Sequence, residues 1–118
     1  MSRTLVLGAS KNPDRASNQV LQKLKDNEIP VVAVGIKEAT VFGIPITKEF
    51  PNSKIDTVTM YLGAKNQTAY YEKIISLNPR RIIFNPGAEN PELFEMANKK
   101  GIDVMNACTL VMLSIGNY

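Results

Sequence analysis

Residues 4–17 read TLVLGASKNPDRAS, and this stretch decides the fold. The segment from Thr4 to Leu7 is a short, mostly apolar run, which is typical of a parallel strand that is buried on both faces. Gly8 ends the run and permits a tight turn out of the strand. A polar loop follows, and Ser17 is predicted to cap a helix that ends near Asn27. The stretch therefore predicts a strand, a loop and a helix in that order.

The same alternation continues along the chain. We expect four further strands at Val31–Val34, Asp56–Leu62, Arg81–Asn85 and Ile102–Met105. We expect further helices at about residues 66–77 and from Pro91 to Gly101, the second capped by Asn90. Residues 35–51 are predicted to be irregular because Pro45 argues against a central strand. A short apolar tail runs from Cys108 to Ile115.

This order of elements predicts one α/β domain over residues 1–118. The predicted architecture is a three-layer, Rossmann-like parallel sheet of about five strands, with helices on both faces. Right-handed crossovers favour the strand order 3-2-1-4-5.

Composition limits the class of protein. Hydrophobic residues make up 44% of the chain and charged residues 21%, as in an ordinary globular domain. The single cysteine, Cys108, cannot form an internal disulfide, which fits a reducing compartment. We find no secretory signal peptide and no apolar run of the ~20 residues that span a bilayer. We therefore expect a cytoplasmic protein with no membrane partner.

The chain has no histidine, and this limits its chemistry. Histidine is the commonest general acid or base near neutral pH and a frequent metal ligand. Hydrolases that use a histidine, His-ligated zinc sites and phosphohistidine transfer are excluded in their usual forms. We predict neither catalytic residues nor metal ligands.

The net charge of +3 suits an anionic ligand. The local basic clusters are Arg80-Arg81 and Lys99-Lys100, each at the end of a predicted element. Nucleic-acid binding usually requires a dense basic face. We therefore expect a small anionic ligand and no nucleic acid.

The binding site is expected beyond the carboxyl ends of the strands, where the strand order reverses. With the predicted order, this crevice lies between residues 8–17 and residues 85–90. The small residues from Gly8 to Ser10 let an anion approach the backbone, and the amides near Ser17 carry partial positive charge. Arg15 can add a guanidinium group. An ordinary turn between a strand and a helix is the alternative interpretation.

The first loop lacks two fingerprints of nucleotide binding. Only the first glycine of Gly-x-Gly-x-x-Gly is present, and the Gly-Lys-Ser/Thr of a P-loop is absent.

Other residues are weaker candidates, each with an alternative interpretation. Lys11, within the loop, can add a point charge. Lys37 follows the second strand and suits a ribose phosphate, or is an ordinary solvated lysine. Tyr61 could stack on adenine or fill the core. Cys108 could be a reactive thiol, although a buried free cysteine is usually inert.

These residues carry a family resemblance. The segment Val6–Val20, with Gly8-Ala9-Ser10, Pro13-Asp14-Arg15 and Ser17, resembles the opening of small stand-alone CoA-binding domain proteins. These proteins are relatives of the CoA-binding domain of the succinyl-CoA synthetase α subunit. The likeness continues through residues 42–46, 56–58, 85–88 and 97–104 and Cys108, and so covers nearly the whole chain.

The resemblance implies non-catalytic binding of coenzyme A or acyl-CoA, with the pyrophosphate over residues 8–17. It places Lys37 near the phosphorylated ribose, and Tyr61 and Leu62 near the adenine or pantetheine. In the synthetase the phosphorylated histidine lies in a further domain, so ligase activity does not carry over. The expected ligand-binding residues are Gly8, Ala9, Ser10, Pro13, Arg15, Ser17, Lys37, Tyr61, Leu62, Asn85, Pro86 and Gly87.

The chain departs from the family pattern in two places on this site. The family often has Asn-Pro or Ser-Pro after the second strand, where this chain has Gly35-Ile36. It often has a glutamine before the glycine that follows the fourth strand, where this chain has Asn85-Pro86 before Gly87. Both changes lie on the expected site, so they bear on the identity of the ligand and not on the fold.

Several functions stay open at this point. The first is a CoA-binding module that acts as a sensor, a carrier or a partner of a larger enzyme. The second is a protein that binds NAD(P) or another nucleotide, or a thiol or redox enzyme that uses Cys108. The third is an interaction subunit with a vestigial pocket. A protein partner or a homo-oligomer is compatible with the first and the third.

Overall fold

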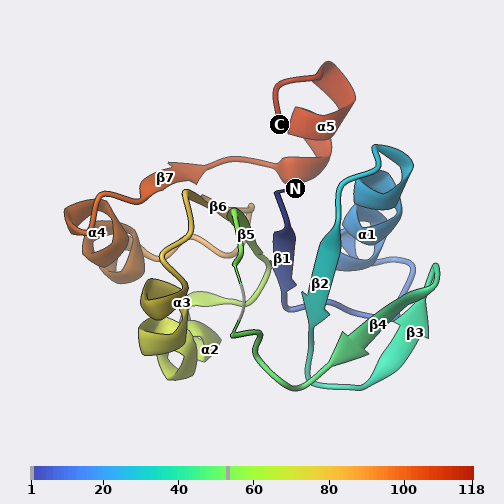
Figure 1. The fold of residues 1–118 in the computed structure, drawn as a ribbon, viewed down its shortest axis with the longest axis horizontal. Helices are drawn as coiled ribbons and strands as arrows, with labels where there is room; N and C mark the ends of the chain where they lie inside the picture. The colour runs from blue at the N-terminus through green and yellow to red at the C-terminus, as the bar shows by residue number, and fades with distance from the viewer. Residues whose placement is uncertain (1, 53) are drawn as a thin grey trace.

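The computed structural model describes residues 2–52 and 54–118, so that Met1, where the predicted domain starts, lies outside the described residues. The strands are β1 (Thr4–Leu7), β2 (Val31–Val34), β3 (Ala39–Val41), β4 (Ile44–Thr47), β5 (Thr57–Met60), β6 (Arg81–Phe84) and β7 (Asp103–Asn106). The helices are α1 (Ala16–Asp26), α2 (Ala64–Gln67), the 3-10 turn η1 (Thr68–Tyr70), α3 (Tyr71–Leu77), α4 (Pro91–Lys99) and α5 (Thr109–Ile115). In the described part of the chain the strands form one seven-stranded sheet (Figure 1).

The two faces of the sheet are covered by different helices. Leu5 and Leu7 of β1 belong to a buried cluster with Ile74 of α3 and Leu93 of α4. Val6, between them, belongs to a second cluster that contains the apolar stripe of α1. A strand that is buried on both faces needs apolar side chains at consecutive positions, as the first stretch of sequence predicted. The predicted α/β fold with helices on both faces is confirmed (Figure 1).

The predicted strand order is wrong. The observed order is β3-β4-β2-β1-β5-β6-β7, and every neighbouring pair is parallel except β3 and β4. The strand predicted at Asp56–Leu62 corresponds to β5. It was expected beside β2 but pairs with β1, on the side away from β2, in the register Thr4↔Thr57. The place beside β2 is taken by β4, in the register Ala33↔Ile46. The chain therefore crosses to the far side of β1 before it forms β5.

The hairpin β3–β4 replaces a segment that was predicted to be irregular. Its turn is formed by Phe42 and Gly43, whose φ angles are 53° and 77°. Two successive positive φ angles are typical of a tight hairpin turn. Pro45 is tolerated because the pairing of β4 with β2 begins only at Ile46. The sequence argument from Pro45 was against a central strand, yet β4 lies between β3 and β2 in the sheet.

The other differences concern helices. The helix predicted at residues 66–77 is divided into α2, η1 and α3, and the apolar tail forms α5. The predicted N-cap of α4 is confirmed, because Asn90 Oδ1 accepts a hydrogen bond from the Leu93 backbone N–H at 3.2 Å. Gly101 follows α4 with φ 81°, the left-handed conformation expected after a helix end.

Candidate functional site

A cleft of about 1010 Å³ opens beyond the carboxyl ends of β1, β2 and β5. Its walls come from three segments: residues 8–17, which reach the first turn of α1, residues 36–37, and residues 61–70, which include α2 and η1. The chain connects β1 to β2 on one side and reaches β5 on the other, so this is where the strand order reverses. Ligands of open parallel sheets bind at such a place. Because the predicted strand order was wrong, the cleft lies beside the loop after β5 and not beside residues 85–90.

Two glycines pack the three loops against one another. Gly8 has φ +98°, and a Cβ placed on it would lie 3.0 Å from the Leu62 backbone nitrogen. A Cβ on Gly35 would lie only 2.3 Å from the Ala9 carbonyl oxygen. The Gly8 and Ala9 amides both donate to the Val34 carbonyl oxygen at 2.9 Å. The loop after β1 is therefore fixed from both sides by backbone contacts.

Within this loop, some backbone amides form internal hydrogen bonds. The Asn12 N–H donates to Ser10 Oγ at 3.0 Å, and the Asp14 N–H donates to Asn12 Oδ1 at 3.0 Å. The Arg15 N–H donates to the Asn12 carbonyl oxygen at 3.1 Å. Four amides that line the cleft make no hydrogen bond to any described residue: those of Ser10, Lys11, Ala16 and Ser17. Free amides at the start of a helix form a site for an anion.

Ser17 does not cap α1 as predicted. The helix begins at Ala16, and Arg15 holds the N-cap position with an extended backbone (φ −91°, ψ 139°). Ser17 is only 5% exposed, lines the cleft and makes no side-chain hydrogen bond to a described residue. Its hydroxyl group is therefore available to a ligand.

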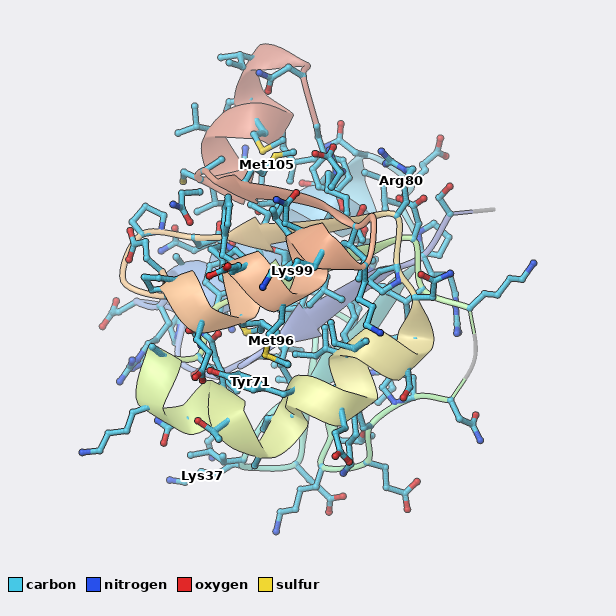
Figure 2. The ribbon with its side chains drawn as sticks, turned by 90° about the vertical axis from the view of Figure 1, so that its left-hand side faces the viewer. Lys37, Tyr71, Arg80, Met96, Lys99 and Met105 are labelled. Atoms are coloured by element: carbon cyan, nitrogen blue, oxygen red, sulfur yellow. The ribbon has the colours of Figure 1, made fainter. Side chains whose placement is uncertain are left out.

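The cleft has an excess of positive charge. Lys11, Arg15 and Lys37 line it, and no carboxylate is among the lining residues. Within residues 2–52 and 54–118, the ion pairs are Arg80–Asp56 and Lys99–Glu95, so these three cations are not neutralised by a salt bridge. Figure 2 shows Lys37 at the edge of the molecule. An anionic ligand would be attracted to this cleft.

The opposite wall is more apolar. Leu62, Ala69 and Tyr70 line it, and the Tyr70 ring stacks on Phe50 with 5.8 Å between ring centroids. Across the cleft, Ile36 is 78% exposed, which is unusual for an isoleucine. These surfaces can contact a planar base or an alkyl chain.

Tyr61 lines the cleft and buries its hydroxyl group, which has no hydrogen-bond partner among the described residues. Burial raises the pKa of Tyr61 to about 12, and the nearby Cys108 acts in the same direction. The hydroxyl groups of Thr59 and Thr109 act in the opposite direction. Tyr61 is therefore a neutral phenol at physiological pH and cannot serve there as a base.

The structure brings eight of the predicted ligand-binding residues together in the cleft: Gly8, Ala9, Ser10, Arg15, Ser17, Lys37, Tyr61 and Leu62. It leaves four outside the cleft lining: Pro13, Asn85, Pro86 and Gly87. Cys108 also lies outside the lining.

Asn85 has a structural role instead. It is buried, and its Nδ2 donates to Thr59 Oγ1 at 2.8 Å and to the Met60 carbonyl oxygen at 2.9 Å. Its Oδ1 accepts from the Thr109 backbone N–H at 2.8 Å. Asn85 therefore ties the first turn of α5 to the sheet.

Sequence reasoning found Tyr61 and Leu62 but missed the rest of the cleft wall that follows β5, together with three residues of the other walls. The residues it did not single out are Asn12, Ala16, Ile36, Gly63, Asn66, Ala69 and Tyr70. The correct strand order would have found Gly63 to Tyr70, because it places the loop after β5 next to the loop after β1.

The described residues contain neither a membrane-spanning helix nor a cluster of metal ligands. No described helix has the length and apolar character needed to cross a membrane. No group of three or more described Cys, Asp or Glu residues is placed to hold a metal ion.

Comparison with known proteins gives a family and a fold. The protein family described as "CoA binding domain" matches residues 2–114. A crystal structure of a protein described as uncharacterized has 42% sequence identity and a TM-score of 0.95, covering 100% of this chain and 98% of that one. No curated protein matches the chain.

Two more distant structures have the same fold. A hypothetical protein from Pyrococcus horikoshii OT3 has 23% identity and a TM-score of 0.86, covering 95% of this chain and 81% of that one. A Thermus thermophilus protein has 20% identity and a TM-score of 0.84, covering 99% of this chain and 90% of that one.

Proposed function

The chain belongs to the CoA binding domain family, and from that membership we propose that its cleft binds coenzyme A or acyl-CoA without catalysing a reaction. The family supports a CoA-binding role in general. The finer assignment, with the pyrophosphate over residues 8–17, rests on the residues of this chain.

One observation carries the proposal. The four free amides of Ser10, Lys11, Ala16 and Ser17 line the same cleft. A pyrophosphate presents several acceptor oxygens and two negative charges. Amides at a helix N-terminus, with the guanidinium of Arg15 beside them, match both properties.

The rest of the cleft suits the rest of the ligand. Lys37, after β2, can pair with the phosphate on the ribose. Ile36 and Tyr70 offer apolar surface on opposite walls for adenine or pantetheine. The volume of about 1010 Å³ is at the upper end of the roughly 300–1,000 Å³ of small-molecule pockets, as a ligand the size of CoA requires.

The proposal is for binding and not for catalysis because the cleft lining contains no carboxylate and the chain contains no histidine. Burial raises the pKa of Tyr61 to about 12, so that this phenol is held neutral. These residues supply no general base near neutral pH.

Thermal denaturation with CoA, acetyl-CoA, dephospho-CoA, NADP, NAD and ATP in parallel tests the proposal. A ligand at a hundredfold excess over its Kd adds about 2.7 kcal/mol to stability, which raises the Tm of a domain of this size by roughly 10 °C. We expect CoA and acetyl-CoA to give this rise and dephospho-CoA a smaller one.

Each other outcome contradicts a stated part of the proposal. Equal rises with CoA and dephospho-CoA would remove the role of Lys37. A rise with NAD or NADP alone would make the protein a binder of redox nucleotides. No rise with any of these ligands would leave the interaction subunit with a vestigial pocket as the better account.

A further inference from the structure

The apolar wall of the cleft rests on a buried amide. Gln67, the last residue of α2, is fully buried. Its Nε2 donates to the Leu62 carbonyl oxygen at 2.8 Å and to the Ala88 carbonyl oxygen at 2.8 Å. Leu62 lines the cleft, whereas Ala88 lies in the turn before α4. One side chain therefore joins the cleft wall to the next layer of the fold.

The orientation of Gln67 is set by Asn90. Asn90 Nδ2 donates to Gln67 Oε1 at 2.9 Å and to the Tyr71 hydroxyl oxygen at 2.8 Å. Asn90 Oδ1 accepts from the Leu93 backbone N–H, so its amide cannot turn over without losing the cap of α4. Because Oε1 of Gln67 faces a donor, its Nε2 must face the two carbonyl oxygens. The cap of α4 therefore fixes the orientation of the Asn90 amide, and Asn90 fixes the orientation of the Gln67 amide.

The wall cannot hold this position alone. α2 is a single turn of four residues, and the chain continues through η1 before α3 begins. Isolated helices this short are unstable in water. Figure 2 shows Tyr71 between α4 and the α2–α3 segment, where it contacts Asn90. The position of the wall therefore depends on the network.

We propose that Gln67 and Asn90 are the positioning residues of the cleft: they set the distance between the wall at residues 61–70 and the loop at residues 8–17. The effect on CoA rests on the proposed function. Gly8 already packs against Leu62, so a shift of Leu62 alters the width of the cleft at this contact. A whole CoA molecule would contact both sides, whereas inorganic pyrophosphate needs only the amides of the loop.

The test uses Asn90→Asp. Aspartate is as good an N-cap as asparagine and has nearly the same shape, so α4 keeps its cap. Its second carboxylate oxygen, however, replaces Nδ2 and faces Gln67 Oε1, which places two acceptors against each other. Asn106→Asp is the matched control. This substitution makes the same change of charge at an exposed residue at the end of β7.

Two measurements are made on each variant. Amide hydrogen exchange without ligand measures how often the backbone of the wall opens. We expect the backbone amides of residues 64–70 to exchange at least about tenfold faster in Asn90→Asp than in the parent. Calorimetry measures the affinity of the cleft for CoA and for inorganic pyrophosphate. We expect the Kd for CoA to rise about tenfold, or about 1.4 kcal/mol, and the Kd for pyrophosphate to stay within about twofold.

The outcomes separate this proposal from the proposed function. Unchanged exchange at residues 64–70 would overturn the positioning role, and so would an equal loss of affinity for CoA and pyrophosphate. If the parent does not bind CoA, the proposed function fails, and the exchange rates still decide whether the network holds the wall. If Asn90→Asp does not fold, Tyr71→Phe removes only one acceptor of Asn90 and should show the same pattern with smaller changes.

Discussion

The loops after β1 and after β6 are similar in sequence character and differ in structure. Both are rich in small and amide residues, and the sequence placed both in the binding site. In residues 8–17, four backbone amides make no hydrogen bond to a described residue and line the cleft. In residues 85–90, the side-chain amides of Asn85 and Asn90 form hydrogen bonds inside the protein, and no residue of this loop lines the cleft. Composition alone therefore does not separate the two loops; the position of their free backbone amides relative to the cleft does.

The largest effect is expected from removing the support of the first loop. Gly35→Ala would put a Cβ 2.3 Å from the Ala9 carbonyl oxygen, so the backbone must move. We expect a loss of about 3 kcal/mol in the free energy of unfolding, together with loss of CoA binding. Urea denaturation measures the first and calorimetry the second.

Gly63→Ala is the control for this variant, because a Cβ there meets nothing within 4 Å and the φ angle is −62°. If Gly35→Ala is as stable as Gly63→Ala, the close packing of the two loops is not what fixes the site.

The loop after β6 should respond in stability but not in binding. Asn85→Ala leaves the Thr109 N–H without its buried acceptor and removes one of the two hydrogen bonds of the Thr59 hydroxyl. We expect a loss of about 2 kcal/mol in stability and an unchanged Kd for CoA, measured by urea denaturation and calorimetry. A tenfold weaker Kd, with the exposed Asn106→Ala as control, would return Asn85 to the binding site.

The loop after β1 should respond in binding but not in stability. Ala16 is the first residue of α1, where proline is well tolerated, and Arg15 before it is extended, as a residue before proline should be. Ala16→Pro therefore removes one free amide and keeps the helix. We expect the Kd for CoA to rise about tenfold with little change in Tm.

Ala16→Ser, which keeps the amide, is the control for the proline variant. Equal affinities for Ala16→Pro and Ala16→Ser would mean that the ligand does not use this N–H.

The smallest effect concerns charge. Arg15 is exposed, so Arg15→Ala should weaken CoA binding by roughly fivefold at low salt and by less as salt screens the interaction. Lys23→Ala removes an exposed cation from the same helix outside the cleft lining and should change nothing. Calorimetry at two salt concentrations measures the difference. A loss that does not depend on salt would contradict an electrostatic role for Arg15.

The sequence predicted the strand, loop and helix at the start of the chain because the apolar run, Gly8 and the polar loop all indicate the same unit. It failed on the strand order because the hairpin β3–β4 was not recognised. The positive φ of Phe42 and the strand position of Pro45 both oppose the usual preferences of those residues. Only the tertiary fit of β4 beside β2 overrides them.

The wrong strand order also explains which residues of the candidate site were mispredicted. With β5 on the wrong side of β1, the sequence placed Asn85 at the cleft and missed Tyr70. Residues of the 8–17 loop were correctly placed at the cleft because β1 was correctly predicted, and the loop that follows a parallel strand lies at the carboxyl edge of the sheet. The free state of particular amides could not be predicted, since it depends on the internal hydrogen bonds that Asn12 makes.

The free amides of the first loop also bear on how this protein can change during evolution. Every residue except proline supplies a backbone N–H. Substitutions at Lys11, Ala16 and other positions of the loop can therefore accumulate without removing the donors, provided that the path of the backbone is kept. Descendants of this chain can diverge widely in sequence and still keep the proposed anion site. The positions that tolerate substitution least are Gly8 and Gly35, where a Cβ would collide with the backbone of a neighbouring loop.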